Sequence, residues 1–266
     1  MNEENLHDSS SEEVISAATA EPLSKSDAMA GVFTEPGDTF EQIAAGPKEN
    51  YWIMPTLILI AAGLIATFIF FSNAELVSKV MSDRMEEAET KLDEEVKKGN
   101  LSREDADQRL EQTKELMDPT SIMFKAIGFG SSILMPFITL IVLAGVYMLG
   151  LKIMKSGVEF YNVLNVVGLG FLIIAIGTII GTVVSVLMGD FKTLGLSLLV
   201  SSDSVGKKLY SFLAAFDIFA IWYYAVVSIG LSKVGKIKPV PAFGLVFGLW
   251  LLWHIVTSFF VAAAFG

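Results

Sequence analysis

Residues 163–188, VLNVVGLGFLIIAIGTIIGTVVSVLM, form a run of 26 positions without a single charged side chain. A helix needs roughly 20 apolar residues to cross a hydrocarbon core about 30 Å thick, so this run is long enough to span a membrane. A helix on the surface of a soluble protein would instead carry charged and polar residues along one face. The run therefore predicts a membrane-spanning helix, and it decides the fold class.

Four further apolar runs accompany this one. They cover residues 51–71, 126–151, 209–231 and 241–265, and the third is interrupted by one charged residue, Asp217. Together the five runs predict an all-α fold, an integral membrane bundle of about five transmembrane helices in which residues 122–266 supply four.

Several details refine these spans. Tyr51 and Trp52 open the first span, as interfacial anchors do. Pro136 lies inside the second span and is expected to kink it, because proline has no backbone N–H to donate. Residues 191–200 are apolar but too few to cross a bilayer, so we expect an interfacial or re-entrant segment there.

The composition agrees with a membrane protein. Apolar residues make up 53% of the chain, the mean hydropathy is +0.57 and charged residues make up only 18%, against about 25% in soluble domains. The net charge of −10 comes from two polar segments, since residues 1–50 carry 11 acids and 2 bases and residues 74–118 carry 14 acids and 8 bases. The sequence has no basic patch of the kind that binds nucleic acid, so no nucleic-acid partner is expected. The absence of cysteine excludes disulfides and thiolate metal sites.

The N-terminal 50 residues divide into two parts. Residues 1–30 are rich in Glu, Ser and Ala and contain no aromatic residue, which predicts a disordered acidic tail. Residues 31–50 are predicted to form a juxtamembrane amphipathic helix, because Glu35-Pro36 is a start signal and Phe40 and Ile43 share one face.

The polar segment 74–118 is predicted to be an extramembrane helical hairpin. Gly99-Asn100 ends a first helix, Ser102 caps a second, and Asp118-Pro119 stops it. The first helix carries an apolar stripe rich in methionine, formed by Val77, Met81, Met85, Ala88, Leu92 and Val96. Such a narrow stripe suits either a solvated paired hairpin or a surface that binds a partner.

The lysines predict the orientation of the chain. The link between the second and third spans carries Lys152 and Lys155, and residues 232–239 carry three more lysines and no acid. Cytoplasmic loops are enriched in such residues. We therefore expect a cytoplasmic N-terminus, with residues 72–121 and the C-terminus on the other side.

The residues that offer chemistry are few. Asp217 is the one acid deep in a predicted span, where it costs about 2.5–3.5 kcal/mol unless it faces protein or water. His254 lies at a similar predicted depth on the neighbouring span, so the two form a candidate intramembrane polar pair. The pair fits a proton or cation site, and it equally fits a structural hydrogen bond. Asn162 and Asn165 begin the third span and are expected to cap it or to line a polar crevice.

Small residues are candidates for helix packing. Gly177 and Gly181 lie four residues apart in one predicted span, and Gly244 and Gly248 do so in another. This spacing lets helices approach closely within a bilayer. It serves packing inside one chain or a contact between two copies.

The last two spans and the juxtamembrane segment resemble a known family. Residues 217–222 (DIFAIW), the Ser228-Ile-Gly230 stretch, the lysine-bearing turn and residues 250–253 (WLLW) are similar to the bacterial branch of the Yip family. So is the lead-in from Val32 to Pro47. These are multi-pass membrane proteins named for their interaction with Ypt/Rab GTPases. The resemblance covers about residues 31–264 apart from the charged insertion, and it implies five spans and a bacterial cytoplasmic membrane. The acidic-Leu-Tyr-Gly-Pro motif of eukaryotic members is absent before the first span.

These observations favour a non-enzymatic membrane scaffold or adaptor that acts through its tail and its hairpin, with a role in membrane organisation or a trafficking-like role. A transporter or channel that uses Asp217 and His254 is the alternative. An intramembrane enzyme is disfavoured, because no nucleophile and base, metal-binding set or cofactor motif is found in the sequence. The expected partners are the lipid bilayer, a protein bound through the hairpin or tail, and a possible second copy of the chain.

Overall fold

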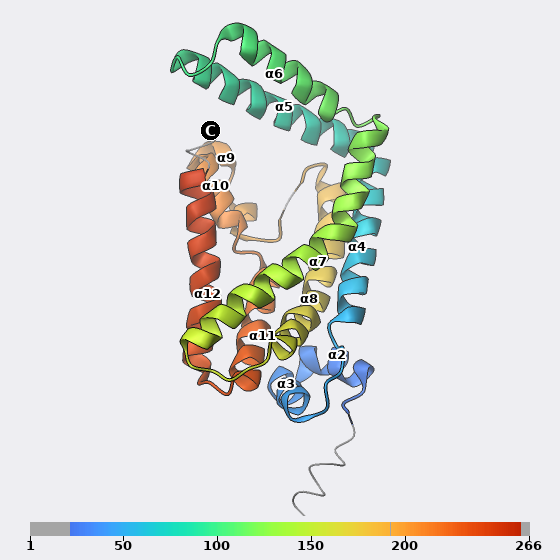
Figure 1. Cartoon of the computed structure of the whole chain (residues 1–266). Coiled ribbons are helices and arrows are strands. Elements are labelled where there is room, and N and C mark those ends of the chain that lie inside the picture. The colour runs from blue at the N-terminus through green and yellow to red at the C-terminus, as the bar shows by residue number, and fades with distance from the viewer. Residues whose placement is uncertain (1–21, 192, 262–266) are drawn as a thin grey trace, which may run out of the picture.

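The structure is a computed structural model that describes residues 22–191 and 193–261. These residues form helices joined by short links, and no β-strand occurs among them. Figure 1 shows an elongated bundle with two short helices, α2 and α3, at one end and the paired helices α5 and α6 at the other. The links between α7 and α8 and between α11 and α12, which carry the lysines, lie at the same end as α2 and α3.

Four stretches are long and apolar enough to cross a membrane: α4 (Ile53–Ser72), α7 (Ile122–Ile153), α8 (Phe160–Met188) and Pro239–Phe259. The last comprises α12 (Pro239–Ile255) and part of a π-helical turn (Val256–Val261). A fifth apolar helix, α11 (Ile218–Val234), has 17 residues. The predicted all-α membrane bundle is confirmed, with four long spans and one short helix. The predicted last span extended to residue 265, which lies outside the described residues.

Helix α8 is the centre of the bundle, with α4 on one side and α11 on the other. Its residues Val163, Val166, Leu169 and Ile173 are fully buried. Two of its glycines allow close approach, because a Cβ at Gly168 would lie 2.4 Å from the Cβ of Trp52, and one at Gly170 would lie 2.7 Å from the ring of Tyr223. Many apolar residues of α7 face outward. Lipid is as apolar as these side chains, so close backbone packing holds such helices together.

Helix α7 runs unbroken through Pro136. Figure 1 shows that α7 changes direction along its length. A proline inside a helix causes such a change, because it removes one hydrogen bond of the helix and crowds the preceding turn.

The predicted span 209–231 is not one continuous helix. Helix α10 (Lys207–Ala214) ends before Asp217, and α11 begins directly after it. At the break the Ile218 N–H donates to the Leu194 carbonyl at 3.2 Å, and an isolated β-bridge joins Gly195 to Asp217. The intervening chain contains a short 3-10 turn (Leu196–Leu199) and the short helix α9 (Ser202–Val205). The break occurs because an aspartate at a helix start is stabilised by the backbone amides there, whereas a carboxylate inside a span is not.

The N-terminal segment also differs from the prediction. Two helices, α2 (Lys25–Thr34) and α3 (Pro36–Ala45), replace the single predicted helix. The chain turns at Glu35, because the residue before a proline is disfavoured in a helix. Residues 25–30 were predicted as part of the disordered tail and are helical instead, capped by Ser24, which accepts from the Asp27 N–H. Residues 1–21 of the predicted tail lie outside the described residues.

The hairpin consists of α5 (Ala74–Lys97) and α6 (Arg103–Leu116). Between them Gly99 has φ +78°, a conformation that glycine adopts at little cost. Ser102 caps α6 by accepting from the Asp105 N–H at 3.0 Å. The two helices pack against each other beyond the end of the bundle (Figure 1).

Candidate functional site

Asp217 is the N-cap of α11. Its Oδ1 accepts hydrogen bonds from the backbone N–H groups of Phe219 at 2.9 Å and Ala220 at 3.1 Å. This satisfies two amides that have no partner within the helix, and the helix dipole favours a negative charge at this end. The carboxylate therefore has a structural role, and the expectation that it lies within an unbroken helix is wrong.

His254 lies in the last turn of α12 and is half-buried. Its ring packs edge-to-face on Trp250, with the ring centroids 5.5 Å apart. Within residues 22–191 and 193–261, no hydrogen bond or ion pair joins His254 to Asp217. The candidate pair is thus not formed as a direct contact.

A chamber of about 430 Å³ is nevertheless present beside Asp217. It lies between α4, α7, α8 and α11. Six hydroxyl-bearing side chains line it: Thr67, Ser132, Thr178, Thr182, Ser185 and Thr193. The hydroxyls of Thr67 and Ser132 are 2.8 Å apart and hydrogen-bonded. The Thr178 and Thr182 hydroxyls donate to carbonyls of the preceding turn of α8, and a hydroxyl that donates in this way can still accept a hydrogen bond from water or a polar solute.

Of the four candidate packing glycines, one lies at a close helix contact and three do not. A Cβ at Gly177 would lie 2.8 Å from Phe219 of α11, so this glycine allows a close helix contact. At Gly181, Gly244 and Gly248 no heavy atom of the described chain, apart from the local helix backbone and chain neighbours, lies within 4 Å of the Cβ position. These three therefore make no comparable contact within one chain.

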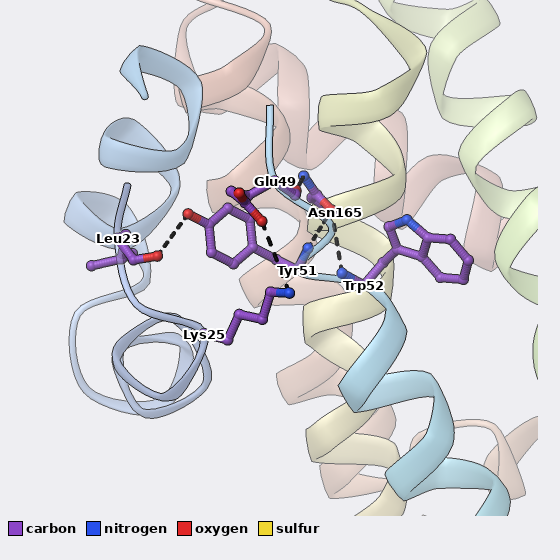
Figure 2. Close-up of polar contacts among 6 residues, drawn as sticks. All are labelled: Leu23, Lys25, Glu49, Tyr51, Trp52 and Asn165. Atoms are coloured by element: carbon purple, nitrogen blue, oxygen red, sulfur yellow. Dashed lines mark hydrogen bonds and ion pairs between the residues drawn. The ribbon is translucent and has the colours of Figure 1, made fainter. Parts of the chain in front are cut away.

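Asn165 joins α8 to the segment that enters α4. Its side chain is fully buried. Oδ1 accepts from the N–H groups of Tyr51 at 3.1 Å and Trp52 at 3.2 Å, and Nδ2 donates to the Glu49 carbonyl at 3.0 Å. Figure 2 shows these contacts converging on one side chain. One amide thus bonds three backbone groups at a helix start. Two of them, the Tyr51 N–H and the Glu49 carbonyl, also bond each other at 3.0 Å, and the Trp52 N–H has Asn165 as its partner.

The sequence singled out Asn165 as a cap or a crevice residue, but it did not indicate its partners. A polar residue inside an apolar run signals a buried hydrogen bond. The partner backbone groups are more than 110 positions away in the chain, and no local pattern encodes such a distance.

Tyr51 also differs from its predicted role. It is 3% exposed, and its hydroxyl donates to the Leu23 carbonyl at 2.8 Å (Figure 2). It therefore connects the N-terminal helices to the bundle instead of lying at the lipid interface. Burial raises the pKa of the Tyr51 phenol, and the nearby Glu49 carboxylate adds to the effect.

Two polar contacts complete this end of the bundle. Lys233 of α11 forms an ion pair with Glu41 of α3. The hydrogen bond from Lys233 lowers the pKa of the Glu41 carboxyl. The Ser156 hydroxyl donates to the Gly235 carbonyl at 2.7 Å and so joins the two lysine-bearing links.

The hairpin end is connected more sparsely. Lys79 of α5 lies 3.4 Å from the Asp190 carboxylate, just beyond α8. Within the hairpin, Arg103 of α6 pairs with Asp93 of α5, which joins the two helices, and with Asp107 of its own helix. No group of three or more His, Asp or Glu side chains in the described residues is placed to hold a metal ion.

Comparison with known proteins supports the family resemblance. A family model described as the Yip1 domain matches residues 30–260. No curated protein and no solved structure matches the chain. The matched range includes the end of α2, all of α3, the hairpin and all five apolar helices. Because the match covers most of its length, the chain belongs to the Yip1 domain family.

Proposed function

We propose that this protein is a non-enzymatic membrane adaptor that presents its hairpin, residues 74–118, to a protein partner. The observation that carries the proposal is that the hairpin is held together mainly by contacts between its own two helices. Its two helices are held by their own contacts, including Arg103 with Asp93, and Ala106 is buried between them. A rigid pair of helices outside the bilayer provides a preorganised surface, which lowers the entropic cost of binding.

The hairpin surface indicates the kind of partner. Its exposed acids follow both helices: Glu75, Asp83, Glu86, Glu89, Glu94, Glu104, Asp105, Asp107, Glu111 and Glu115. An acidic face of this kind attracts a basic one and raises the rate of encounter. We therefore propose a partner with a basic surface and a role in membrane organisation.

The topology completes the proposal. With the lysine-bearing links in the cytoplasm, α2 and α3 lie on the cytoplasmic side and the hairpin lies on the opposite side of a bacterial inner membrane. The acidic N-terminal tail is a second candidate surface for a partner.

Site-specific photo-crosslinking in intact membranes tests the proposal. A photoreactive residue at Glu111, exposed on α6, is expected to capture the partner. The same residue at Leu149, which is 64% exposed on α7, serves as the lipid-facing control. A variant with a Gly-Ser linker in place of residues 80–117 is expected to lose the partner, to lose only the helicity of α5 and α6 and to keep cooperative unfolding of the bundle. Absence of protein adducts at Glu111 and at further exposed positions of both helices contradicts the proposal.

A second function, passage of a small polar solute, is favoured by the hydroxyl-lined chamber beside Asp217. Asp217→Asn is the informative variant, because asparagine also caps helices well and so removes the charge while keeping the fold. In proteoliposomes we expect solute or proton flux that this substitution reduces at least tenfold. Equal flux in the variant, or none in the native protein, removes this candidate.

A further inference from the structure

A groove under the hairpin has the character of a lipid site. It has a volume of about 370 Å³, and its walls are α4, α7 and α8, with α5 above. The apolar lining residues are mainly aromatic: Phe70, Phe71, Phe124 and Phe191, with Ile127, Leu76 and Val80. This volume lies within the range of about 300–1,000 Å³ typical of sites for small ligands.

The position of the groove determines what can fill it. Three of its walls belong to helices long and apolar enough to span a membrane, at the ends nearest the hairpin. The solvent there is lipid, so an acyl chain enters without leaving an apolar environment. The 52% exposed Ile127 lies along this lining and leaves the groove open to the bilayer.

One cation lines this mainly apolar groove, whose lining also includes the hydroxyls of Thr67, Thr182 and Ser185, shared with the chamber beside Asp217. Arg84 extends from α5, the helix that covers the groove. Its guanidinium lies 3.4 Å from the Glu87 carboxylate, and Glu87 has a second partner in Lys91 at 3.4 Å. A phosphate group can therefore replace Glu87 as the partner of Arg84 while Glu87 keeps an ion pair. Arginine suits this role, because its planar fork binds phosphate oxygens in pairs.

We propose that the groove holds one phospholipid of the surrounding membrane, with an acyl chain against the phenylalanines and its phosphate on Arg84. A lipid in this position touches both the spanning helices and the underside of α5. It therefore acts as a third contact between hairpin and bundle, beside the Lys79–Asp190 ion pair and the buried Leu76 and Val77. The lipid site stands whether or not the hairpin binds a protein.

Filling the groove tests the proposed position of the acyl chain. Ile127→Trp adds a large ring inside the groove, whereas Ile141→Trp adds the same ring to an equally exposed position elsewhere on α7. Native mass spectrometry of the detergent-purified protein is expected to show one bound phospholipid in the native chain and in Ile141→Trp. The Ile127→Trp variant is expected to lose it, and Ala66→Leu, a second filling change, is expected to weaken it. Equal lipid retention in all four proteins overturns the proposal.

Removing the cation tests the position of the phosphate. For short-chain phosphatidylglycerol we expect Arg84→Gln to weaken binding about tenfold, since a charge-assisted contact contributes about 1.5–3 kcal/mol before screening. Arg109→Gln removes the same charge from an exposed position on α6 and is expected to leave binding unchanged. Diacylglycerol lacks the phosphate, so we expect the native chain to bind it more weakly than phosphatidylglycerol. We also expect the native chain, Arg84→Gln and Arg109→Gln to bind diacylglycerol equally. If diacylglycerol and phosphatidylglycerol bind the native chain equally, Arg84 does not hold a headgroup and the proposal is wrong in that part.

Discussion

The protein carries two pairs of helices outside its spans, and they are attached in opposite ways. The N-terminal pair, α2 and α3, contributes fully buried residues such as Ala28, Val32 and Phe40 to the main core. The hairpin pair, α5 and α6, buries mainly its base and its own seam, at Leu76, Val77 and Ala106. The first pair is a structural part of the bundle, whereas the second is an attached and largely self-sufficient unit.

This difference shows how a membrane protein can combine stability and binding. At the N-terminal end, backbone groups without helix partners are satisfied by one buried amide, which fixes the geometry tightly. At the hairpin end, one partly exposed ion pair, Lys79–Asp190, joins the hairpin to the bundle beside the buried Leu76 and Val77, and such a pair contributes little. The hairpin, which we propose as the partner-binding surface, can thereby change its position without loosening the spans.

The largest expected effect is at Asn165. Asn165→Leu leaves the Trp52 N–H without a partner and leaves the Tyr51 N–H and the Glu49 carbonyl with only each other, so we expect a loss of about 1–3 kcal/mol in the free energy of unfolding. Hydrogen exchange at Tyr51 and Trp52 is expected to accelerate as well. Thermal and denaturant unfolding in detergent measure the loss. Asn162→Leu is the control, because this half-buried side chain has no such bond, and a similar loss there contradicts the role given to Asn165.

A smaller effect is expected at Tyr51. Tyr51→Phe removes the hydroxyl that donates to the Leu23 carbonyl and keeps the ring, so we expect a loss of about 0.5–1.5 kcal/mol. Protease sensitivity of residues 22–34 is expected to rise, because α2 loses one attachment. Tyr223→Phe, on α11, serves as a comparison, because this buried hydroxyl has no hydrogen-bond partner among the described residues. Unchanged stability and protection in Tyr51→Phe refute the prediction.

The hairpin contact is expected to contribute less. The side chains of Lys79 and Asp190 are 47% and 26% exposed, and solvent screens such a pair. A double-mutant cycle with Lys79→Gln and Asp190→Asn is expected to give a coupling of about 0.2–1 kcal/mol that shrinks in high salt. A coupling above that range would place the hairpin with the tightly attached elements and would remove the contrast between the two pairs.

The smallest effect concerns pH. Because the Lys233 contact lowers the pKa of Glu41, the folded state keeps this carboxylate charged at lower pH than the unfolded state does. The ion pair therefore stabilises the folded state at pH values above the pKa of Glu41 in the unfolded chain, about 4.3. This stabilisation is lost as the pH falls through the lower pKa that Glu41 has in the folded state. Unfolding measured between pH 7 and pH 3 is expected to show this dependence, and Glu41→Gln is expected to reduce it. An identical pH profile in that variant assigns the dependence to other groups.

The sequence predicted the spans well, because lipid imposes a length and an apolar character that can be read along the chain. It placed the hairpin correctly too, since Gly99 and Ser102 are local signals. It failed at Asp217, where two local tendencies compete: the apolar run favours a continuous helix, and the aspartate favours a helix start. It also could not find the partners of Asn165, because those contacts depend on how α4 and α8 meet.

The short length of α11 has a consequence for the bilayer itself. Its 17 residues cover about 25 Å, less than the hydrocarbon thickness of about 30 Å. Such hydrophobic mismatch is accommodated by local thinning of the bilayer or by neighbouring polar segments at the short end. The membrane beside Asp217 is therefore expected to be thinner than around α7, and the protein is expected to favour thin membrane regions.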